Sequence, residues 1–168
     1  MITPSYCALM ARYNAWQNSE LFTALDPAPA EEVVADRGAF FGSILGTLNH
    51  ILWADQIWMS RFDERFAKPD GGIPESPRLC PDYCAWRDER ASMDARMAEW
   101  AAGLSHEDLA GDVAWYSGAA ERDVVKPRAF CISHMFNHQT HHRGQVHTMM
   151  TSAGFTGNTS DLFLIPEI

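Results

Sequence analysis

The chain has 168 residues, of which 46% are hydrophobic and 21% charged, and this composition is typical of a single globular domain. No apolar run approaches the roughly 20 residues needed to cross a bilayer, which argues against a membrane protein. The formal net charge is −9 and lysine and arginine form no stripe, which argues against direct nucleic-acid binding. We expect one domain over residues 1–168, in the cytoplasm because Met1–Tyr6 do not resemble a secretory signal.

Four cysteines are too few for a disulfide scaffold in a chain of this size. A structural zinc site is an alternative for three of them. However, Cys80 and Cys84 lack the tight CxxC spacing, and adding Cys131 still leaves the set one ligand short. We therefore expect free thiols at Cys7, Cys80, Cys84 and Cys131.

Two helices are predicted in the first part of the chain. Apolar residues at three- to five-residue spacing predict a helix from Pro4 to Leu25, which ends at a proline-rich segment over residues 26–29. A second apolar stripe predicts a helix from Phe40 to Phe66, and this helix carries His50. The Pro/Gly-rich segment Pro69–Pro77 then predicts a loop.

Two more helices are predicted in the second part. One covers Pro81–Ala102, where glycine follows as a stop. Apolar and polar residues alternate over Gly111–Val125, which predicts a short hairpin or an ordered loop. The last helix extends from Lys126–Pro127 to Ala153–Gly154. Four amphipathic helices predict an all-α four-helix bundle, with residues 155–168 as an irregular tail folded back on it.

Histidines are concentrated in the last predicted helix, which carries five of the seven in the chain. His134, His138 and His142 are spaced by four, and a step of four turns a helix by only about 40°, so the three share one face. Two imidazoles at positions i and i+4 can converge on one metal ion. A half-exposed polar face is the alternative, but Cys131 and Met149 on the same face indicate that it points inward.

His50 is the candidate for a third ligand. It lies among apolar residues of the second predicted helix, where a bare imidazole is poorly satisfied. A hydrogen-bonded core histidine is the alternative, and the sequence cannot show that the two helices are adjacent. With the histidine cluster on the last helix, the prediction is a metal site made of His50, His138 and His142.

Two other kinds of helical metal site do not fit the sequence. A zinc protease of the H-E-x-x-H type needs glutamate after its first histidine, and here Gln139 follows His138. A carboxylate-bridged di-iron bundle needs Glu-x-x-His pairs, and neither the second nor the last helix has one. A three-histidine site keeps coordination positions open for water or substrate, which is typical of a catalytic metal centre.

The segment His138–Gln145, together with Leu48–Asp55 on the earlier helix, resembles the DinB/YfiT family, and the likeness covers nearly the whole chain. The resemblance implies a four-helix bundle, a homodimer, and metal ligation by His50 and by the His138 and His142 pair that precedes an R-G-Q signature. Among the remaining signature residues, it implies supporting or substrate-contacting roles for Arg143 and Gln145.

The resemblance also implies an activity. It predicts a thiol-dependent transferase in which zinc or nickel binds a low-molecular-weight thiol as thiolate for attack on an electrophilic small-molecule substrate. His134 and His141 are candidate partners of the ligands or proton carriers. Two alternatives stay open: a non-enzymatic metal-binding stress-response protein, and a hydrolase that uses metal-activated water.

Overall fold

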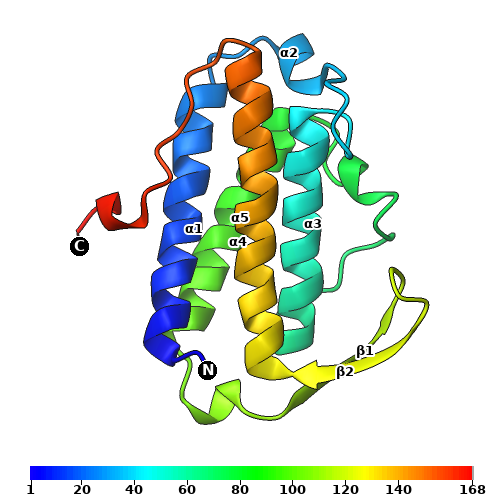
Figure 1. The fold of residues 1–168 in the computed structure, drawn as a ribbon, viewed down its shortest axis with the longest axis vertical. Helices are drawn as coiled ribbons and strands as arrows, with labels where there is room; N and C mark the ends of the chain where they lie inside the picture. The colour runs from blue at the N-terminus through cyan, green and yellow to red at the C-terminus, as the bar shows by residue number, and fades with distance from the viewer. Residues whose placement is uncertain (168) are drawn as a thin grey trace.

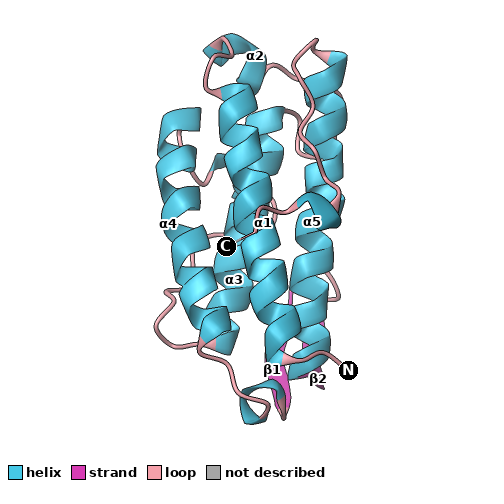
Figure 2. Cartoon of the chain, turned by 90° about the vertical axis from the view of Figure 1, so that its left-hand side faces the viewer, coloured by secondary structure: helices cyan, strands magenta, loops and turns pink. Residues whose placement is uncertain are grey.

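The computed structural model describes residues 1–167. Four long helices lie side by side along its longest axis (Figure 1). Helix α1 packs mainly against α4, and α3 packs mainly against α5. The view in Figure 2 shows the same four helices from the side. Their bounds are α1 Pro4–Leu25, α3 Ile44–Phe62, α4 Tyr83–Ala102 and α5 Arg128–Ser152, so the predicted four-helix bundle is confirmed.

Local capping explains why α3 is shorter than the predicted Phe40–Phe66 helix. The Ser43 hydroxyl accepts a hydrogen bond from the Gly46 amide at 3.0 Å and so caps the N-terminus of α3. At the other end, Asp63 has extended backbone angles, φ −152° and ψ 122°, which end the helix after Phe62. The segment before Ser43 is therefore free to turn, and it places Phe41 beside α3 rather than on it.

A β-hairpin precedes the last helix, as one of the two predicted forms of this segment. Strands β1 (Asp112–Ser117) and β2 (Arg122–Pro127) pair antiparallel, and the hairpin extends from the lower end of the bundle on the α3 side (Figure 1). The predicted helix start at Lys126–Pro127 is one to two residues too early. Pro127 pairs with Asp112 in the hairpin and has extended angles, so α5 begins at Arg128.

Shorter segments connect or follow the long helices, among them the 3-10 helices Ser76–Arg78 and Glu107–Leu109. A short helix, α2 (Ala30–Val34), lies between α1 and α3 and was not predicted; it buries only Val33. The C-terminal tail folds back along the bundle as predicted as far as Ser160, whose carbonyl accepts a hydrogen bond of 2.6 Å from the Tyr13 hydroxyl. Beyond it the short 3-10 helix Leu162–Leu164, which was not predicted, is exposed and projects from the bundle. Ile168, the last residue of the predicted tail, lies outside the described residues.

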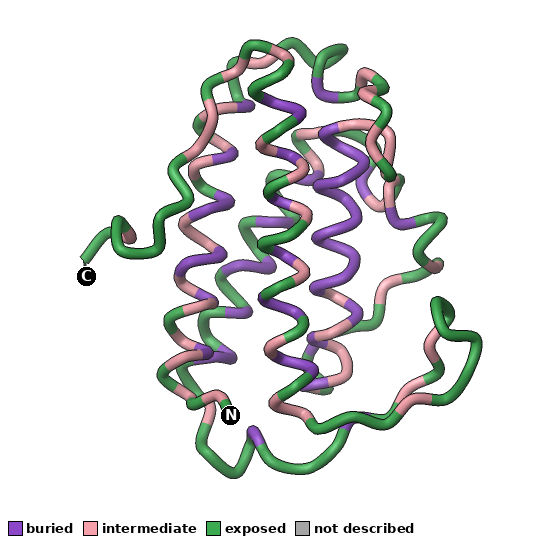
Figure 3. Tube along the Cα trace, in the orientation of Figure 1, coloured by how far each residue is buried: buried purple, intermediate pink, exposed green. Residues whose placement is uncertain are grey.

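The inward faces of the four long helices form the core (Figure 3), and this core contains a polar network. Arg90 of α4 contacts Asp55 of α3 at 2.6 Å and Asp94 of its own helix at 2.8 Å. Asn14 of α1 donates to Asp94, and Gln139 of α5 donates to Asp55 at 2.8 Å. These five residues, called the buried polar network below, join all four helices at one level.

The cysteines and the apolar content of the helices were also considered in the sequence. The four cysteines are free thiols, three of them buried and Cys84 exposed. None of the helices within residues 1–167 has the length and the apolar content of a membrane span.

Candidate metal centre

The three predicted histidine ligands come together between α3 and α5. His138 Nε2 lies 3.2 Å from His50 Nε2 and 3.1 Å from His142 Nε2. One ring nitrogen from each histidine lies within 4.8 Å of the other two. The packing of α3 against α5, which the sequence could not show, brings His50 opposite the pair on α5.

His50 is oriented by a residue from the loop after α3. Its Nδ1 lies 2.8 Å from the Ser76 hydroxyl oxygen, and that hydroxyl donates its own hydrogen to the Ile73 carbonyl at 2.7 Å. The hydroxyl oxygen must therefore accept from His50 Nδ1, which carries the ring proton. His50 Nε2 then presents a lone pair to the other two histidines.

His142 is oriented in the same way by Gln145, one turn further along α5. The Gln145 side-chain oxygen lies 2.7 Å from His142 Nδ1, and its side-chain nitrogen lies 3.3 Å from His141 Nε2. The oxygen accepts the Nδ1 proton, so His142 Nε2 also presents a lone pair. Gln145 is thus placed to orient His142, and His141 contacts both Gln145 and the His142 ring, which lies edge to face at 4.8 Å between centroids.

His138 cannot satisfy both neighbouring lone pairs. Its Nε2 carries at most one proton and faces the Nε2 lone pairs of His50 and His142. Its Nδ1 is buried and has no hydrogen-bond partner among residues 1–167. A cation between the three Nε2 atoms would use every lone pair that points there, so the residues fit a metal ion.

Burial keeps these imidazoles in the neutral form. Desolvation, with repulsion from the neighbouring His142 as a second cause, lowers the pKa of His50 to about 4 and that of His138 to about 3. The pKa of His142 is also lowered, again mainly by burial. Neutral imidazole is the form that ligates metals, so the cluster is ready to bind an ion near pH 7.

Two neighbours of the cluster were not identified from the sequence. Phe41 stacks on the His50 ring at 3.8 Å between ring centroids, and it also contacts the edge of His142. Ser76 reaches His50 from the loop after α3. Neither residue belongs to a recognisable motif, because Phe41 precedes α3 and Ser76 opens the short 3-10 helix Ser76–Arg78, and the path of both segments depends on tertiary packing.

A cleft of about 400 Å³ opens beside His50 and His138, between α3, α5, the hairpin and the 68–73 loop. His134 lines this cleft, with its ring 5.7 Å from His138 and 5.2 Å from Trp58 between centroids. No hydrogen bond joins His134 to the three clustered histidines within the described residues. His134 thus lines the cleft beside His138 and lies outside the group of three converging nitrogens.

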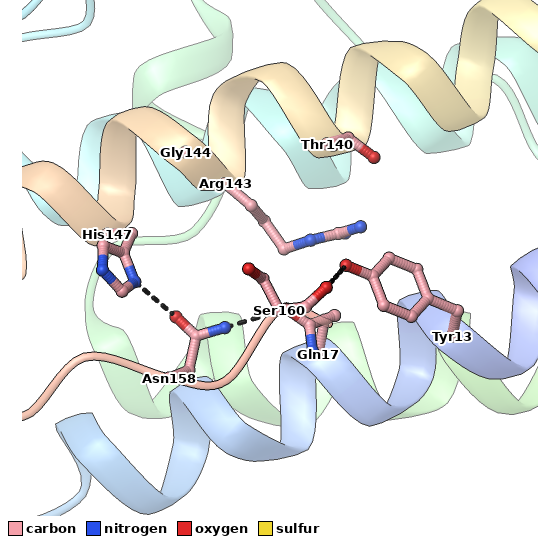
Figure 4. Close-up of a pocket in the computed structure, with 8 residues that line it drawn as sticks. All are labelled: Tyr13, Gln17, Thr140, Arg143, Gly144, His147, Asn158 and Ser160. Carbon is pink, nitrogen blue, oxygen red and sulfur yellow. Dashed lines mark hydrogen bonds between the residues drawn. The ribbon is translucent and has the colours of Figure 1, made fainter. Parts of the chain in front are cut away.

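Arg143 points away from the histidines. Successive helix residues are about 100° apart, and Arg143 accordingly faces α1, where it donates to the Asn14 side-chain oxygen. Figure 4 shows its guanidinium above Tyr13 in a second, smaller cavity, one side of which is formed by the C-terminal tail. Arg143 thus joins the buried polar network through Asn14 and contacts none of the three candidate ligands.

The fold and the histidine cluster define a class: helical bundle proteins with a candidate metal centre between the second and the last of four long helices. The chain belongs to the DinB family, whose sequence model matches residues 1–167. It is similar to Protein DinB of Bacillus subtilis (strain 168), with 21% identity over 150 residues that cover 89% of this chain and 87% of that protein.

A crystal structure of a DinB-like protein from Bacillus cereus ATCC 10987 is similar in fold. Its TM-score is 0.62 with 18% identity, and the match covers 93% of this chain and 91% of that one. At this identity the likeness shows the fold alone. The family resemblance seen in the two histidine-bearing segments is confirmed.

Proposed function

We propose that His50, His138 and His142 hold a divalent transition metal ion, zinc or nickel, and that the protein is a metal-dependent S-transferase acting with a low-molecular-weight thiol. The observation that carries this proposal is the convergence of three neutral imidazole nitrogens, one from each histidine. Among residues 1–167, no other His, Cys, Asp or Glu belongs to this group. A site with three protein ligands leaves positions open for exogenous ligands, as catalytic metal centres do.

The chain's own residues would orient the ligands and hold the substrate. A bound ion of this kind supplies acidity, because a coordinating thiol loses its proton near neutral pH. Ser76 and Gln145 keep the Nε2 lone pairs of His50 and His142 directed to one point. Phe41 covers the His50 ring, and the cleft beside His50 and His138 offers room for an electrophilic small molecule.

Thiol chemistry fits this site better than hydrolysis does. Hydrolysis by metal-activated water is helped by a general base, and no Asp or Glu is among the residues lining the cleft. His134 is the one imidazole of the lining outside the cluster, and its ring packs against Trp58 without a hydrogen bond to the three clustered histidines among residues 1–167. Gln139, next to His138, is used in the buried polar network, where it donates to Asp55. A thiol that is already ionised needs no such base.

Metal content and turnover together test the proposal. Purified wild-type protein should contain about one transition metal ion per chain, and His50→Ala should contain much less, whereas His106→Ala, an exposed histidine outside the cluster, should match wild type. After cobalt substitution, a low-molecular-weight thiol should change the metal's absorption spectrum. Turnover of an electrophile with that thiol should disappear in His138→Ala.

Two results would contradict the proposal in different ways. Absence of metal in the wild type, or equal turnover by metal-free protein, would remove the metal-dependent mechanism. Tight metal uptake with no thiol-dependent turnover across a broad panel of electrophiles would favour a non-enzymatic metal-binding stress-response protein. The family also leads us to propose a cytoplasmic homodimer, which sedimentation velocity and cell fractionation would test.

A further inference from the structure

The cleft beside the candidate metal centre has a basic lining. Arg61 and Lys68 are its charged residues apart from the histidines, and neither Asp nor Glu contributes to it. The whole chain has 22 acidic and 13 basic side chains, so the local balance is opposite to that of the molecule. The net negative charge of the chain repels anions, whereas the positive charges of the cleft lining attract them.

Arg61 holds a fixed position in this cleft without an anionic partner. Its guanidinium carbon lies 4.5 Å from the centre of the Trp58 ring and 5.0 Å from that of Trp115. These two indoles, from α3 and β1, meet edge to face at 5.3 Å and hold the cation by cation–π contact. The side chain is half-buried, and its charged end is therefore ordered before any ligand binds.

The donors of Arg61 are unused within residues 1–167. None of the ion pairs or hydrogen bonds in that part of the chain includes its guanidinium, although arginine has five N–H groups. By contrast, Arg65, one turn beyond, pairs with Asp63 at 2.7 Å, and the buried Arg90 pairs with two carboxylates. Burial lowers the pKa of Arg61, as expected for a cation that has lost water without gaining an anion.

We infer that the cleft binds an acceptor substrate with a carboxylate at one end and a flat apolar part, and that Arg61 is the residue that binds the carboxylate. Guanidinium and carboxylate match in a two-pronged hydrogen bond, while Trp58, Trp115 and Ile57 form the apolar walls. This inference rests on the proposed function in one respect: only that function makes the bound molecule the acceptor of the thiol. The binding itself does not depend on turnover.

The spacing along α3 restricts the shape of this substrate. His50 and Arg61 are eleven residues apart, which separates their Cα atoms by about 16 Å in a helix. The route between them passes the rings of His134 and Trp58, which lie 5.2 Å apart. The Arg61 guanidinium reaches back over Trp58, so a carboxylate bound there is separated from His138 by the Trp58 and His134 rings, and the reacting atom lies at the opposite end of the molecule.

Calorimetric titration with a matched pair of probes tests the inference. The probes are 2-naphthoate and its neutral analogue 2-naphthamide, each titrated into zinc-loaded and into metal-free wild-type protein. We expect naphthoate to bind about tenfold or more tightly than the amide in both forms, the size of one charge-assisted hydrogen-bonded pair. The net charge of −9 disfavours such a preference unless a specific cation provides it.

Three variants locate the cation. Arg61→Gln should lose most of the preference for naphthoate, since only Lys68 remains as a cation of the cleft, whereas Arg61→Lys should keep more of that preference. Arg65→Gln is the matched control, because this exposed residue pairs with Asp63 and lies outside the cleft lining; it should behave as wild type. Near-UV circular dichroism of each variant reports whether the Trp58 and Trp115 packing is retained.

The results separate this inference from the proposed function. Equal binding of the two probes by wild type, or an unchanged preference in Arg61→Gln, would overturn it. A preference that requires zinc and survives Arg61→Gln would overturn it too, because the carboxylate would then bind the metal. Arg61-dependent binding in a protein without thiol-dependent turnover would keep the inference and remove only the S-transferase proposal.

Discussion

Gln145 and Ser76 decide which nitrogen of each histidine faces the candidate metal centre. An imidazole offers a lone pair at only one of its nitrogens, and the hydrogen bond at the other nitrogen selects which one. Gln145 reaches His142 because residues three apart meet on a helix surface, so the sequence could place it. Ser76 reaches His50 across 26 positions of the chain, and only the folded loop shows this contact.

Replacing Ser76 by alanine tests the orienting role at the residue scale. Without the hydroxyl, the Nδ1 proton of His50 has no acceptor, and we expect metal affinity to fall about 10- to 100-fold, the usual cost of losing such a partner. Competition against a chromophoric chelator measures the change. Ser60→Ala is the control, since that hydroxyl bonds only to the Ile57 carbonyl; equal affinities of the two variants would argue against the role.

The lowered histidine pKa values predict how the stability of the metal-free protein depends on pH. The pKa of His50 is about 4 and that of His138 about 3 in the folded protein, against 6.5 for an ordinary histidine. Below about pH 6.5 these histidines are protonated in the unfolded chain but stay neutral in the folded protein. Stability supplied by these rings is complete above that pH and is lost as the pH falls toward the folded values.

Urea unfolding at pH 7, 6 and 5 measures this loss, and comparison of wild type with a histidine variant separates it from carboxylates such as Asp55, whose pKa is raised by burial. In wild type, the free energy of unfolding should decrease as the pH is lowered. His138→Ala should give a flatter profile, by up to about 1.4 kcal/mol per pH unit for one proton. Parallel profiles of wild type and variant would show that His138 is not held neutral.

At the scale of elements, the buried polar network fixes the relative height of the four helices. Each long helix contributes at least one member, and the central Arg90 is fully buried between two carboxylates. Gln139 ties α5 to α3 through Asp55 directly beside His138. The network therefore holds the two histidine-bearing helices in the register that brings their Nε2 atoms together.

Removing the central cation should destabilise the bundle strongly. Arg90→Met leaves Asp55 and Asp94 buried without their partner, which typically costs about 3–5 kcal/mol. Arg87→Met on the same helix is the matched control, because its pair with Asp26 is half-exposed and such pairs contribute about 1 kcal/mol or less. Chemical denaturation measures both; a similar small loss in both variants would contradict the central role of Arg90.

At the scale of the whole molecule, metal binding at the candidate centre is linked to the stability of the folded protein. The three histidines belong to α3 and α5, so an ion that binds them in the folded state stabilises the packing of the two helices. A ligand that binds only the folded state raises stability by about 2.7 kcal/mol at 100 times its dissociation constant. Metal addition is therefore expected to raise the melting temperature.

Thermal unfolding with and without zinc checks this coupling. The melting temperature of wild type should rise with zinc concentration, and that of His142→Ala should not. His106→Ala, whose histidine is exposed and distant in sequence from the cluster, should respond as wild type does. An equal rise in all three proteins would show that zinc acts elsewhere.

The sequence by itself determined the four helices, because apolar periodicity and end signals such as the stop after Ala102 are local properties of the chain. It also determined that His138 and His142 share a face, because helix geometry relates residues four apart. Local patterns were less informative at the ends, where Ser43 and the pairing of Pro127 set the starts of α3 and α5.

Only the tertiary structure decided what lies around the pair on α5. The approach of His50, the contacts of Ser76 and Phe41, and the turning of Arg143 toward α1 all depend on how α3, α5 and the loops pack. The same is true of Arg61, whose contacts with both Trp58 and Trp115 join a helix to a hairpin. Contacts between distant segments depend on the sum of many weak packing terms, which no short pattern in the chain records.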